Sequence, residues 1–445
     1  MNKNILKITA TIVIGSLLLS ACKKNFFYEG INNDPGSVTQ SQLPPTVLLN
    51  GAELSIGYSV GGDFSRYTSI FVNSVQGNNR QFATYQNYVF TAQDFQTPWA
   101  NIYQQGLNNL SGLKSIATAK GYSHYQGVAN VLMAYQFGLA TDMWGDIPYS
   151  NALQGNIGNI KPTFDKQSAI YTSLQITLDS ALVQLARGNG GKPVGGDDFI
   201  FNGSIPKWIA FANALKARYY LHLSKTDNTF ATKVLTSVNA ALAGSAQSAQ
   251  VPFFNNETQA NPWYQYLQQR GDISYVNGFL ATTLKSMNDP RLGAYIDGTN
   301  DVLTSLYAGI AAPVTLLSKT EMLFIKTEAL SAIGDPTATT FYNAAITSSF
   351  SDAGVAVPAV YLTANALTGA THASRLPQIM LQKYLALFTQ AESFNDWRRT
   401  GYPVLKPNNG PSIPRRFLYP QTELDYNGPN VPTGTTLFSK VGWDL

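Results

Sequence analysis

The chain has 445 residues, a length that suits one large domain or two to three ordinary ones. Hydrophobic residues make up 44% and can form a sizeable core, whereas charged residues reach only 13%, about half the usual share of roughly 25%. The formal charge of +4 is not gathered in any basic run, and binding to nucleic acid needs clustered Lys and Arg, so we expect no nucleic-acid partner. A surface rich in amides, hydroxyls and tyrosines instead suits uncharged polar ligands such as sugars or peptides.

Residues 1–21 have the pattern of an export signal. Two lysines precede the apolar stretch Ile8–Leu19, which at about 12 residues is too short for a transmembrane helix. The segment ends in Leu19-Ser20-Ala21-Cys22, a lipobox in which the cysteine sulfur takes a diacylglycerol. The sequence therefore predicts a mature chain that starts at a lipidated Cys22 and is anchored by its acyl chains. A plain secretory signal with a chance cysteine is the alternative.

Residues 22–45 are rich in Asn, Gly, Pro and Ser and are predicted to form a tether to a single domain, residues 46–445. Cys22 is the only cysteine, which excludes a disulfide within the chain and a thiolate metal cluster. The three histidines have no metal-ligand spacing. We expect neither a metal nor a cofactor.

Helical periodicity dominates residues 46–445. Apolar residues recur on one face within 128–139, within 171–185 and within 208–219. Asp165 is placed to cap the second of these helices, and glycines from residue 188 onward are placed to end it. Strand-like runs such as Tyr88 to Thr91 are short, so we predict a mainly α fold with minor β-strands.

The clearest helical unit starts at Ser318. Ser318-Lys-Thr-Glu321 matches a capping box, and Gly334 with Asp335-Pro336 separates its helix from a second one that ends near Ser351. The unit is about 34 residues long, the length of a tetratricopeptide helix pair. The consensus residues of that repeat are not evident, so the length alone supports tetratricopeptide-like helix pairs joined by long loops.

Three aromatic clusters are candidate ligand sites, because sugar sites combine aromatic faces with a few placed polar groups. The first is a predicted loop, Asn261-Pro-Trp263-Tyr264-Gln265-Tyr266, which leads to Arg270 and Asp272. The others are Phe64-Ser-Arg66-Tyr67 and Tyr85-Gln-Asn-Tyr88. The candidate binding residues are Trp263, Tyr264, Tyr266, Arg270, Phe64, Tyr67 and Tyr88. Ordinary packing is the alternative for each cluster.

Several segments, in order along nearly the whole chain, resemble the SusD/RagB family of outer-membrane nutrient-binding lipoproteins. The run closest to its SusD-like branch is Asp142-Met143-Trp144-Gly145-Asp146-Ile147-Pro148-Tyr149. The other segments are Trp99-Ala-Asn-Ile-Tyr103, Trp208 to Arg218, Asn288-Asp289-Pro290-Arg291, Glu321 to Leu330, Gln382-Lys383-Tyr384, Asp396 to Pro403, Ile413-Pro414-Arg415-Arg416, Tyr419-Pro420, Glu423 and Asn427.

The resemblance implies a mostly helical fold with four tetratricopeptide-like helix pairs. It also implies a lipid-anchored location on the outer membrane, an oligosaccharide or oligopeptide ligand, and a partner, a TonB-dependent β-barrel transporter of the SusC type. Lys23-Lys24 stand where surface-exported relatives often carry acidic residues, so an outward-facing position is implied by the family alone.

The most conspicuous motifs are interpreted as structural. Bulky Trp and Pro in a turn mostly pack, so residues 142–149 are expected to form a fold-defining corner, with a ligand or partner site as the alternative. The arginines of Asp396-Trp-Arg-Arg399 are expected to pair with Glu321, Glu328 or Glu392, and Arg415-Arg416 are interpreted in the same way, although bidentate binding of an anion is the alternative.

Three functions are compatible with these patterns. The favoured one is a non-enzymatic binding protein that delivers nutrient, most often oligosaccharide, to its transporter. A surface glycan or peptide hydrolase is the main alternative, although no Gly-x-Ser-x-Gly elbow or His-Glu-x-x-His helix occurs in the sequence. The third is a helical-repeat scaffold of an envelope complex. The sequence does not identify the ligand.

Overall fold

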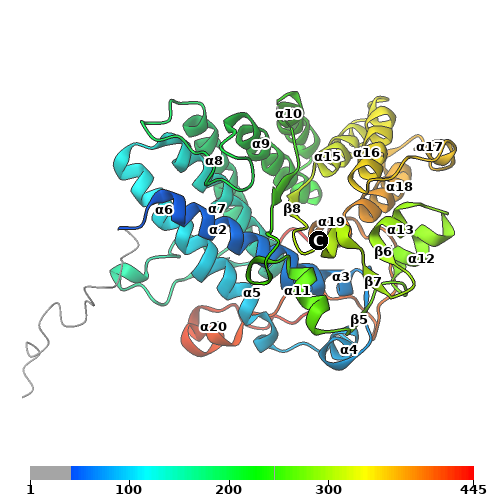
Figure 1. Ribbon diagram of the computed structural model, residues 1–445, viewed down its shortest axis with the longest axis horizontal. Coiled ribbons are helices and arrows are strands. Elements are labelled where there is room, and N and C mark those ends of the chain that lie inside the picture. Colours follow the sequence, from blue (N-terminus) through cyan, green and yellow to red (C-terminus); the bar gives the residue numbers. More distant parts are fainter. Residues whose placement is uncertain (1–41, 245) are drawn as a thin grey trace, which may run out of the picture. The chain divides into compact units, whose positions relative to one another are not determined.

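Helices and long loops make up most of the computed structural model, which describes residues 42–244 and 246–445 (Figure 1). Pro44–Leu445 forms one compact unit. Among the described helices, none is both long and apolar enough to cross a membrane. The predicted signal peptide, Cys22 and the tether up to residue 41 lie outside the described residues.

A row of paired helices runs across the unit. In each pair two consecutive helices pack side by side, and α8 also contacts α9 while α10 contacts α15 (Figure 1). The pairs are α7 (Ser123–Trp144) with α8 (Gln167–Leu185), α9 (Ile205–His222) with α10 (Phe230–Ala243), α15 (Lys319–Ala332) with α16 (Ala338–Asp352), and α18 (His372–Ala386) with α19 (Glu392–Thr400). This arrangement confirms the predicted mainly α fold of tetratricopeptide-like helix pairs.

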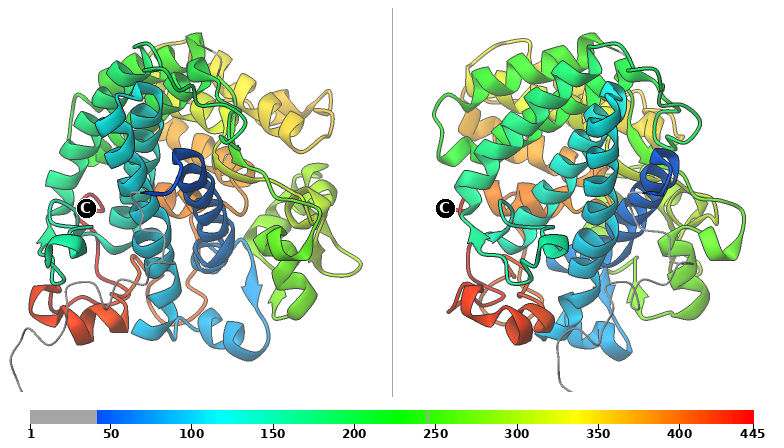
Figure 2. Two further views of the ribbon diagram at one scale, coloured as in Figure 1. Left: turned by 60° about the vertical axis from the view of Figure 1, so that its left-hand side comes forward. Right: turned by 90° about the vertical axis from the view of Figure 1, so that its left-hand side faces the viewer.

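The remaining elements lie on the inner side of this row or at its ends (Figure 2). α2 (Pro45–Ser59) runs beneath the arc of helix pairs and packs against α6, η5 and α7. The other helices are η3 (Val60–Phe64), α3 (Ser65–Phe71), α4 (Arg80–Gln86), η4 (Ala92–Phe95), α5 (Gln96–Ala100), η5 (Asn101–Leu107), α6 (Asn108–Lys120), η6 (Gly155–Ile157), η7 (Leu223–Lys225), η8 (Glu257–Gln259), α11 (Pro262–Gln269), α12 (Phe279–Ser286), α13 (Arg291–Tyr295), α14 (Ser305–Ala308), α17 (Tyr361–Ala364), α20 (Gln421–Tyr426) and η9 (Gly428–Asn430).

Strands are short and join the loops of the described residues in antiparallel pairs. The pairs are β1 (Gln76–Gly77) with β5 (Ile273–Ser274), β2 (Ile147–Pro148) with β3 (Phe164–Asp165), β4 (Ala249–Val251) with β8 (Val314–Leu317), and β6 (Ile296–Asp297) with β7 (Val302–Leu303). The segment Tyr88 to Thr91, predicted to be strand-like, forms no strand, because Tyr88 adopts a φ of 58° in a turn.

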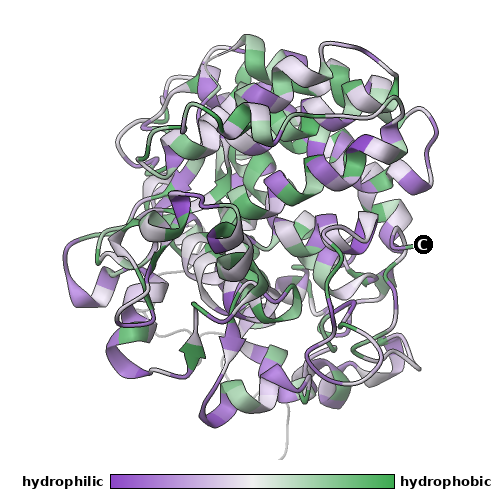
Figure 3. Cartoon of the chain, turned by 90° about the vertical axis from the view of Figure 1, so that its right-hand side faces the viewer, coloured by the Kyte–Doolittle hydropathy of each residue, from purple (hydrophilic) through white to green (hydrophobic). Residues whose placement is uncertain are grey.

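Apolar faces of the paired helices form the core. Hydrophobic and hydrophilic residues alternate along these helices, as expected of helices with one buried side (Figure 3). α7 is buried almost all round, and at Gly138 it approaches α9 so closely that an added Cβ would lie 2.1 Å from the Tyr219 hydroxyl. That hydroxyl donates to the carbonyl of Ala134 at 2.9 Å, so the glycine allows a hydrogen bond between the two helices.

The corner after α7 has the structural role that the sequence predicted. Gly145 adopts a φ of 77°, which suits glycine, and Trp144 is fully buried with its indole N–H donating to the carbonyl of Leu418 at 2.8 Å. Asp146 accepts the backbone N–H of Gln167 at 2.9 Å and so caps α8. The predicted cap by Asp165 is wrong, because Asp165 lies in β3 and its carboxylate accepts backbone N–H groups of the corner instead.

Buried ion pairs connect α19 with α15 inside the row of helix pairs. Arg399 binds Glu328 with both terminal nitrogens, one of them at 2.8 Å from Oε2, and also binds Asp396 at 2.7 Å. These contacts confirm the prediction for Arg399, and Arg415 likewise pairs with an internal carboxylate, that of Asp444. The prediction is wrong for Arg398 and Arg416, whose guanidiniums bind the Asn395 side chain and backbone carbonyls instead. Ser318 caps α15 as predicted, but Glu321 does not complete the capping box, because both of its oxygens bind Arg218 at 2.7 Å.

Candidate functional site

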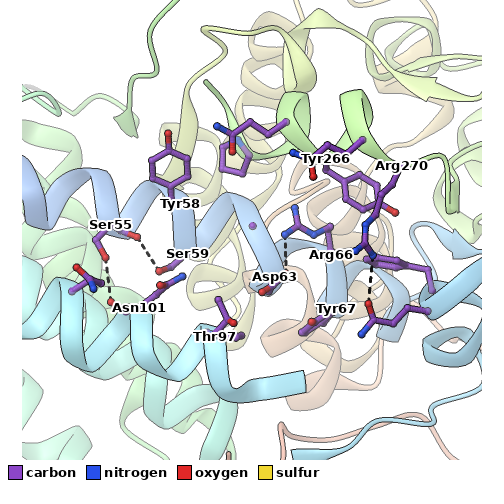
Figure 4. Close-up of a pocket in the computed structure, with 18 of the residues that line it drawn as sticks. Ser55, Tyr58, Ser59, Asp63, Arg66, Tyr67, Thr97, Asn101, Tyr266 and Arg270 are labelled. Atoms are coloured by element: carbon purple, nitrogen blue, oxygen red, sulfur yellow. Dashed lines mark hydrogen bonds and ion pairs between the residues drawn. The ribbon is translucent and has the colours of Figure 1, made fainter. Parts of the chain in front are cut away.

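A cleft of about 700 Å³ opens between the N-terminal helices and α11 (Figure 4). Its walls come from three segments within residues 51–105 and from a fourth, residues 262–270, that lies far away in the sequence. It is lined by Gly51, Ser55, Tyr58, Ser59, Gly62, Asp63, Arg66, Tyr67, Gln81, Phe82, Tyr85, Thr97, Pro98, Asn101, Gln105, Pro262, Gln265, Tyr266, Gln269 and Arg270. Rings, amides and hydroxyls dominate this lining.

Two π-helical segments lie on the walls of the cleft. η3 joins α2 to α3, and at Gly62 the backbone leaves the helical conformation (φ −91°, ψ −122°) before Asp63 and Arg66. η5 forms the facing wall and contributes Asn101 and Gln105. π-helical turns are rare and are frequently found at functional sites, so η5 supports the cleft as the candidate site, whereas η3 contains a kink at Gly62 between two helical segments.

The third wall is α11, which the sequence predicted to be a loop. Asn261 caps this helix: its side-chain oxygen accepts the backbone N–H of Trp263 at 2.7 Å, while its amide donates to the carbonyl of Ala312 at 2.8 Å. Residues three and four positions apart share one face of a helix, so the cap directs Gln265, Tyr266 and Gln269 toward the cleft. The loop prediction is wrong because a two-turn helix is too short to show periodicity.

Five aromatic side chains line the cleft. The rings of Tyr67 and Tyr85 are 5.3 Å apart, as are those of Phe82 and Tyr266, and both pairs meet edge to face. Tyr58 lies farther along α2 and is half-buried. Burial raises the pKa of Tyr58, Tyr67 and Tyr266, so these hydroxyls stay neutral and can donate hydrogen bonds at physiological pH. The aromatic wall thus offers apolar faces together with hydroxyl donors.

Polar side chains alternate with these rings. Arg66 donates to Asp63 at 2.8 Å, and its guanidinium lies 5.2 Å from the centre of the Tyr266 ring. Ser55 donates to the backbone carbonyl of Asn101 at 3.1 Å, and Ser59 donates to that of Ser55 at 2.9 Å (Figure 4). A site of this kind can hold a ring-shaped polar molecule by stacking and by hydrogen bonds to its rim.

The structure brings three of the predicted binding residues together in this cleft: Tyr67, Tyr266 and Arg270. Phe64 and Trp263 lie behind its wall. Phe64 is fully buried between Trp144 and Phe417, and the indole N–H of Trp263 donates to the Ser65 hydroxyl at 3.1 Å. Both support the wall rather than line the cleft.

Tyr264 and Tyr88 do not line the cleft. Tyr264 is on α11 but outside the face formed by Pro262, Gln265, Tyr266 and Gln269. Tyr88 is 7% exposed, and its hydroxyl accepts the backbone N–H of Asn408 at 2.9 Å. Its role is therefore to fasten the C-terminal loop.

Sequence reasoning missed the contribution of α2. Gly51, Ser55, Tyr58 and Ser59 form one polar stripe on this helix, while Leu48, Leu49, Ala52 and Ile56 are buried on its other side. Positions i, i+4, i+7 and i+8 lie on one side of a helix, so this stripe was the available signal. The amides of Gln81 and Gln105 had no comparable signal.

A buried acidic and imidazole cluster is the candidate for a metal site in the described residues. Single ligand atoms of Asp142, His222 and Glu392 lie within 4.8 Å of one another. His222 Nε2 lies 2.7 Å from Glu392 Oε1, and Nδ1 lies 2.7 Å from the Tyr171 hydroxyl. Burial lowers the pKa of His222, but the two carboxylates raise it more, to about 9. The imidazole and the two carboxylates therefore form a buried network of ion pairs.

The row of helix pairs and the lined cleft define a helical-repeat protein with an open cleft of rings and polar side chains. A sequence model of SusD-like proteins, described as starch-binding and associating with the outer membrane, matches residues 37–311 and 300–420. The chain therefore belongs to the SusD-like family, as the resemblance of its motifs predicted.

Solved structures share this fold over most of the chain. A chitin-binding protein is 21% identical, with a TM-score of 0.76 and coverage of 90% of this chain and 100% of that chain. A SusD/RagB family protein from Bacteroides thetaiotaomicron VPI-5482 is 23% identical, with a TM-score of 0.75 and coverage of 90% and 99%. A SusD homolog from Bacteroides fragilis NCTC 9343 is 21% identical, with a TM-score of 0.74 and coverage of 91% and 99%. A comparison with curated protein sequences finds no significant match.

Proposed function

We propose that this protein is a cell-surface lipoprotein that binds an oligosaccharide in the cleft and delivers it to a SusC-like TonB-dependent transporter. The observation that carries the proposal is the cleft lining, in which aromatic rings alternate with amides and hydroxyls. The family is associated with the outer membrane and with starch binding, and the fold is shared with a chitin-binding protein.

The chemistry of the lining supports a sugar as ligand. A pyranose ring has a flat C–H face, which stacks on rings such as Tyr58 and Tyr266, and a rim of hydroxyls that both donate and accept. Asn101, Gln105 and Gln269 provide carbonyl acceptors and N–H donors for that rim. An open cleft of about 700 Å³ can hold part of a longer chain and leave the rest accessible to a partner.

The same lining supports binding without turnover. A glycosidase needs two carboxyl groups, roughly 5–10 Å apart, on either side of the bond that it cleaves. Of the described residues that line the cleft, Asp63 is the only carboxylate, and it is engaged with Arg66 at 2.8 Å. We therefore propose that the bound oligosaccharide leaves unchanged.

Delivery requires the protein to be tethered next to its transporter. The lipobox at Cys22 would supply the anchor, and the predicted tether of residues 22–45 would link it to the domain. The resemblance to the family implies a complex with such a transporter. The alternative of a scaffold without a ligand would not explain a cleft lined by rings and amides.

Calorimetry with maltooligosaccharides, chitooligosaccharides and neutral oligopeptides tests the proposal. We expect at least one glycan to bind and Tyr58→Ala to weaken that binding about fivefold, because one stacking contact contributes about 1 kcal/mol. Tyr426→Ala is the matched control, because Tyr426 is 74% exposed on α20 and lies outside the cleft lining. Two results would contradict the proposal: hydrolysis of a glycan during incubation with the protein, or equal affinity of the wild type and the Tyr58→Ala variant for every glycan.

A further inference from the structure

Arg270 lies where two hollows of the surface meet. It lines the cleft, and it also lines a second hollow of about 480 Å³ together with Tyr266 and Gln269. The far side of that hollow is formed by Asn78, Tyr275 and Asp301, among others. A chain molecule that extends from the cleft into this second hollow would cross the border that Arg270 shares with Tyr266 and Gln269.

The hydrogen-bond donors of Arg270 are largely uncommitted. The side chain is 41% exposed, and its hydrogen bond to the side-chain oxygen of Gln81 is long, at 3.5 Å. Asp272 lies 4.0 Å from the guanidinium, too far for a hydrogen bond, and both of its carboxylate oxygens are buried without a hydrogen-bond partner. The carboxylate of Asp272 therefore attracts the guanidinium of Arg270 electrostatically, but it accepts no hydrogen bond from the N–H groups of Arg270, which stay available to a ligand.

The other arginine of the cleft differs in this respect. Arg66 is 14% exposed, and its charge is already matched by Asp63 at 2.8 Å. The charged side chains that line the cleft are Asp63, Arg66 and Arg270. Arg270 shares the single carboxylate of Asp272 with Arg80, so this group of three side chains carries a net charge of +1 at the edge of the cleft. Arg80 adds a second, 64% exposed guanidinium 3.7 Å from the opposite side of Asp272.

From this geometry we infer that the ligand is an acidic glycan whose sugar carboxylate binds Arg270. The inference rests on the proposed function and narrows its substrate class. A guanidinium matches a carboxylate with two parallel hydrogen bonds, and the rings and amides on either side of Arg270 suit the neighbouring sugars. An acidic peptide would use the same cation, but it would leave the flat aromatic faces without a partner.

Matched pairs of ligands that differ only in charge test the inference. The probes are tetragalacturonate with its methyl ester, and tetramannuronate with its carboxyl-reduced form. We expect one acidic probe to bind the wild-type protein about tenfold or more tighter than its neutral counterpart, since a hydrogen bond to a charged group contributes at least that factor. We also expect its affinity to fall with added salt.

Arg270→Gln keeps the length and polarity of the side chain and removes its charge. We expect this variant to bind each acidic probe no tighter than its neutral counterpart and to lose the salt dependence. Arg187→Gln, at an exposed arginine beyond the C-terminal end of α8, is the matched control and should bind as the wild type does. Circular dichroism and thermal unfolding check that both variants are folded.

The outcomes separate this inference from the proposed function. If neutral glycans bind and acidic probes bind no tighter, or if Arg270→Gln keeps the preference for acid, the acidic-glycan inference fails and the proposed function stands. If acidic peptides such as tetraglutamate bind and no glycan does, both fail.

Discussion

Replacement of His222 by Gln is expected to remove a pH-dependent part of the stability of this protein. The imidazole is fully buried among Asp142, Glu392 and the Tyr171 hydroxyl, and the ring of Trp443 lies 5.4 Å away. Because burial disfavours the charged form while two carboxylates favour it more strongly, the pKa of His222 is raised from its ordinary value of 6.5 to about 9.

The magnitude follows from this pKa difference. The folded protein holds the proton more tightly than the unfolded chain, so the stabilisation is complete below about pH 6.5 and is lost as the pH rises to about 9. A pKa difference of this size corresponds to about 3 kcal/mol, since each unit is worth about 1.4 kcal/mol. The free energy of unfolding of the wild-type protein should therefore fall by about 3 kcal/mol between about pH 6.5 and pH 9.

Urea unfolding at several pH values between 6 and 9.5 measures the effect. We expect His222→Gln to be less stable than the wild type at pH 6 and the difference to shrink toward pH 9, because glutamine carries no titrating proton. His124→Gln is the matched control: its ring is bonded only to the carbonyl of Arg187, and its curve should run parallel to the wild type. A wild-type curve that is flat or rises between pH 6.5 and 9, or a His222 variant with the wild-type slope, would refute this reasoning.

Two further predictions concern the buried ion pairs and the anchor. Glu328→Gln should lower the free energy of unfolding, measured with urea, by about 3–5 kcal/mol. The reason is that Arg399 and Glu328 are both at most 2% exposed, so the substitution leaves part of the buried charge of Arg399 uncompensated. Lys233→Gln, which breaks an exposed pair with Asp227, should cost less than about 1 kcal/mol, and equal losses in the two variants would contradict the argument. Cys22→Ser should move the protein from the membrane to the soluble fraction, because the acyl chains are attached to that sulfur; a mature wild-type chain whose thiol is free in mass spectrometry would show that the lipobox prediction is wrong.

Helical periodicity made much of the fold predictable. The apolar stripes within residues 128–139, 171–185 and 208–219 correspond to α7, α8 and α9, and the unit from Ser318 to Ser351 corresponds to α15 and α16. Each of these helices is long enough for a 3.6-residue period to appear several times. α11 was mispredicted because its 8 residues cover two turns, although Asn261 and Pro262 form a usual start of a helix.

Aromatic clusters in the sequence located the region of the candidate site but not its lining. Of the first cluster, Tyr266 faces the cleft, Trp263 is buried behind it, and Tyr264 lies on another side of α11. A cluster of rings is equally suited to a core and to a sugar site, and the sequence holds no signal that separates them. The orientation of α11 determines which of these rings face the cleft and which are buried. That orientation depends on contacts such as the hydrogen bond from Asn261 to the carbonyl of Ala312.

The sequence by itself determined the family, the helical class and the expected anchor, because each depends on patterns that are local along the chain: a lipobox, an apolar period, a Gly after a long helix. Only the tertiary structure decided that Tyr58, Arg66, Gln81, Gln105 and Arg270 share one cleft. Their segments are separated by up to about two hundred residues, and their proximity results from packing of α2, η5 and α11 against the helix pairs. Burial likewise decided which charges are neutralised inside the protein and left Arg270 as the cation with free donors on the wall of the cleft.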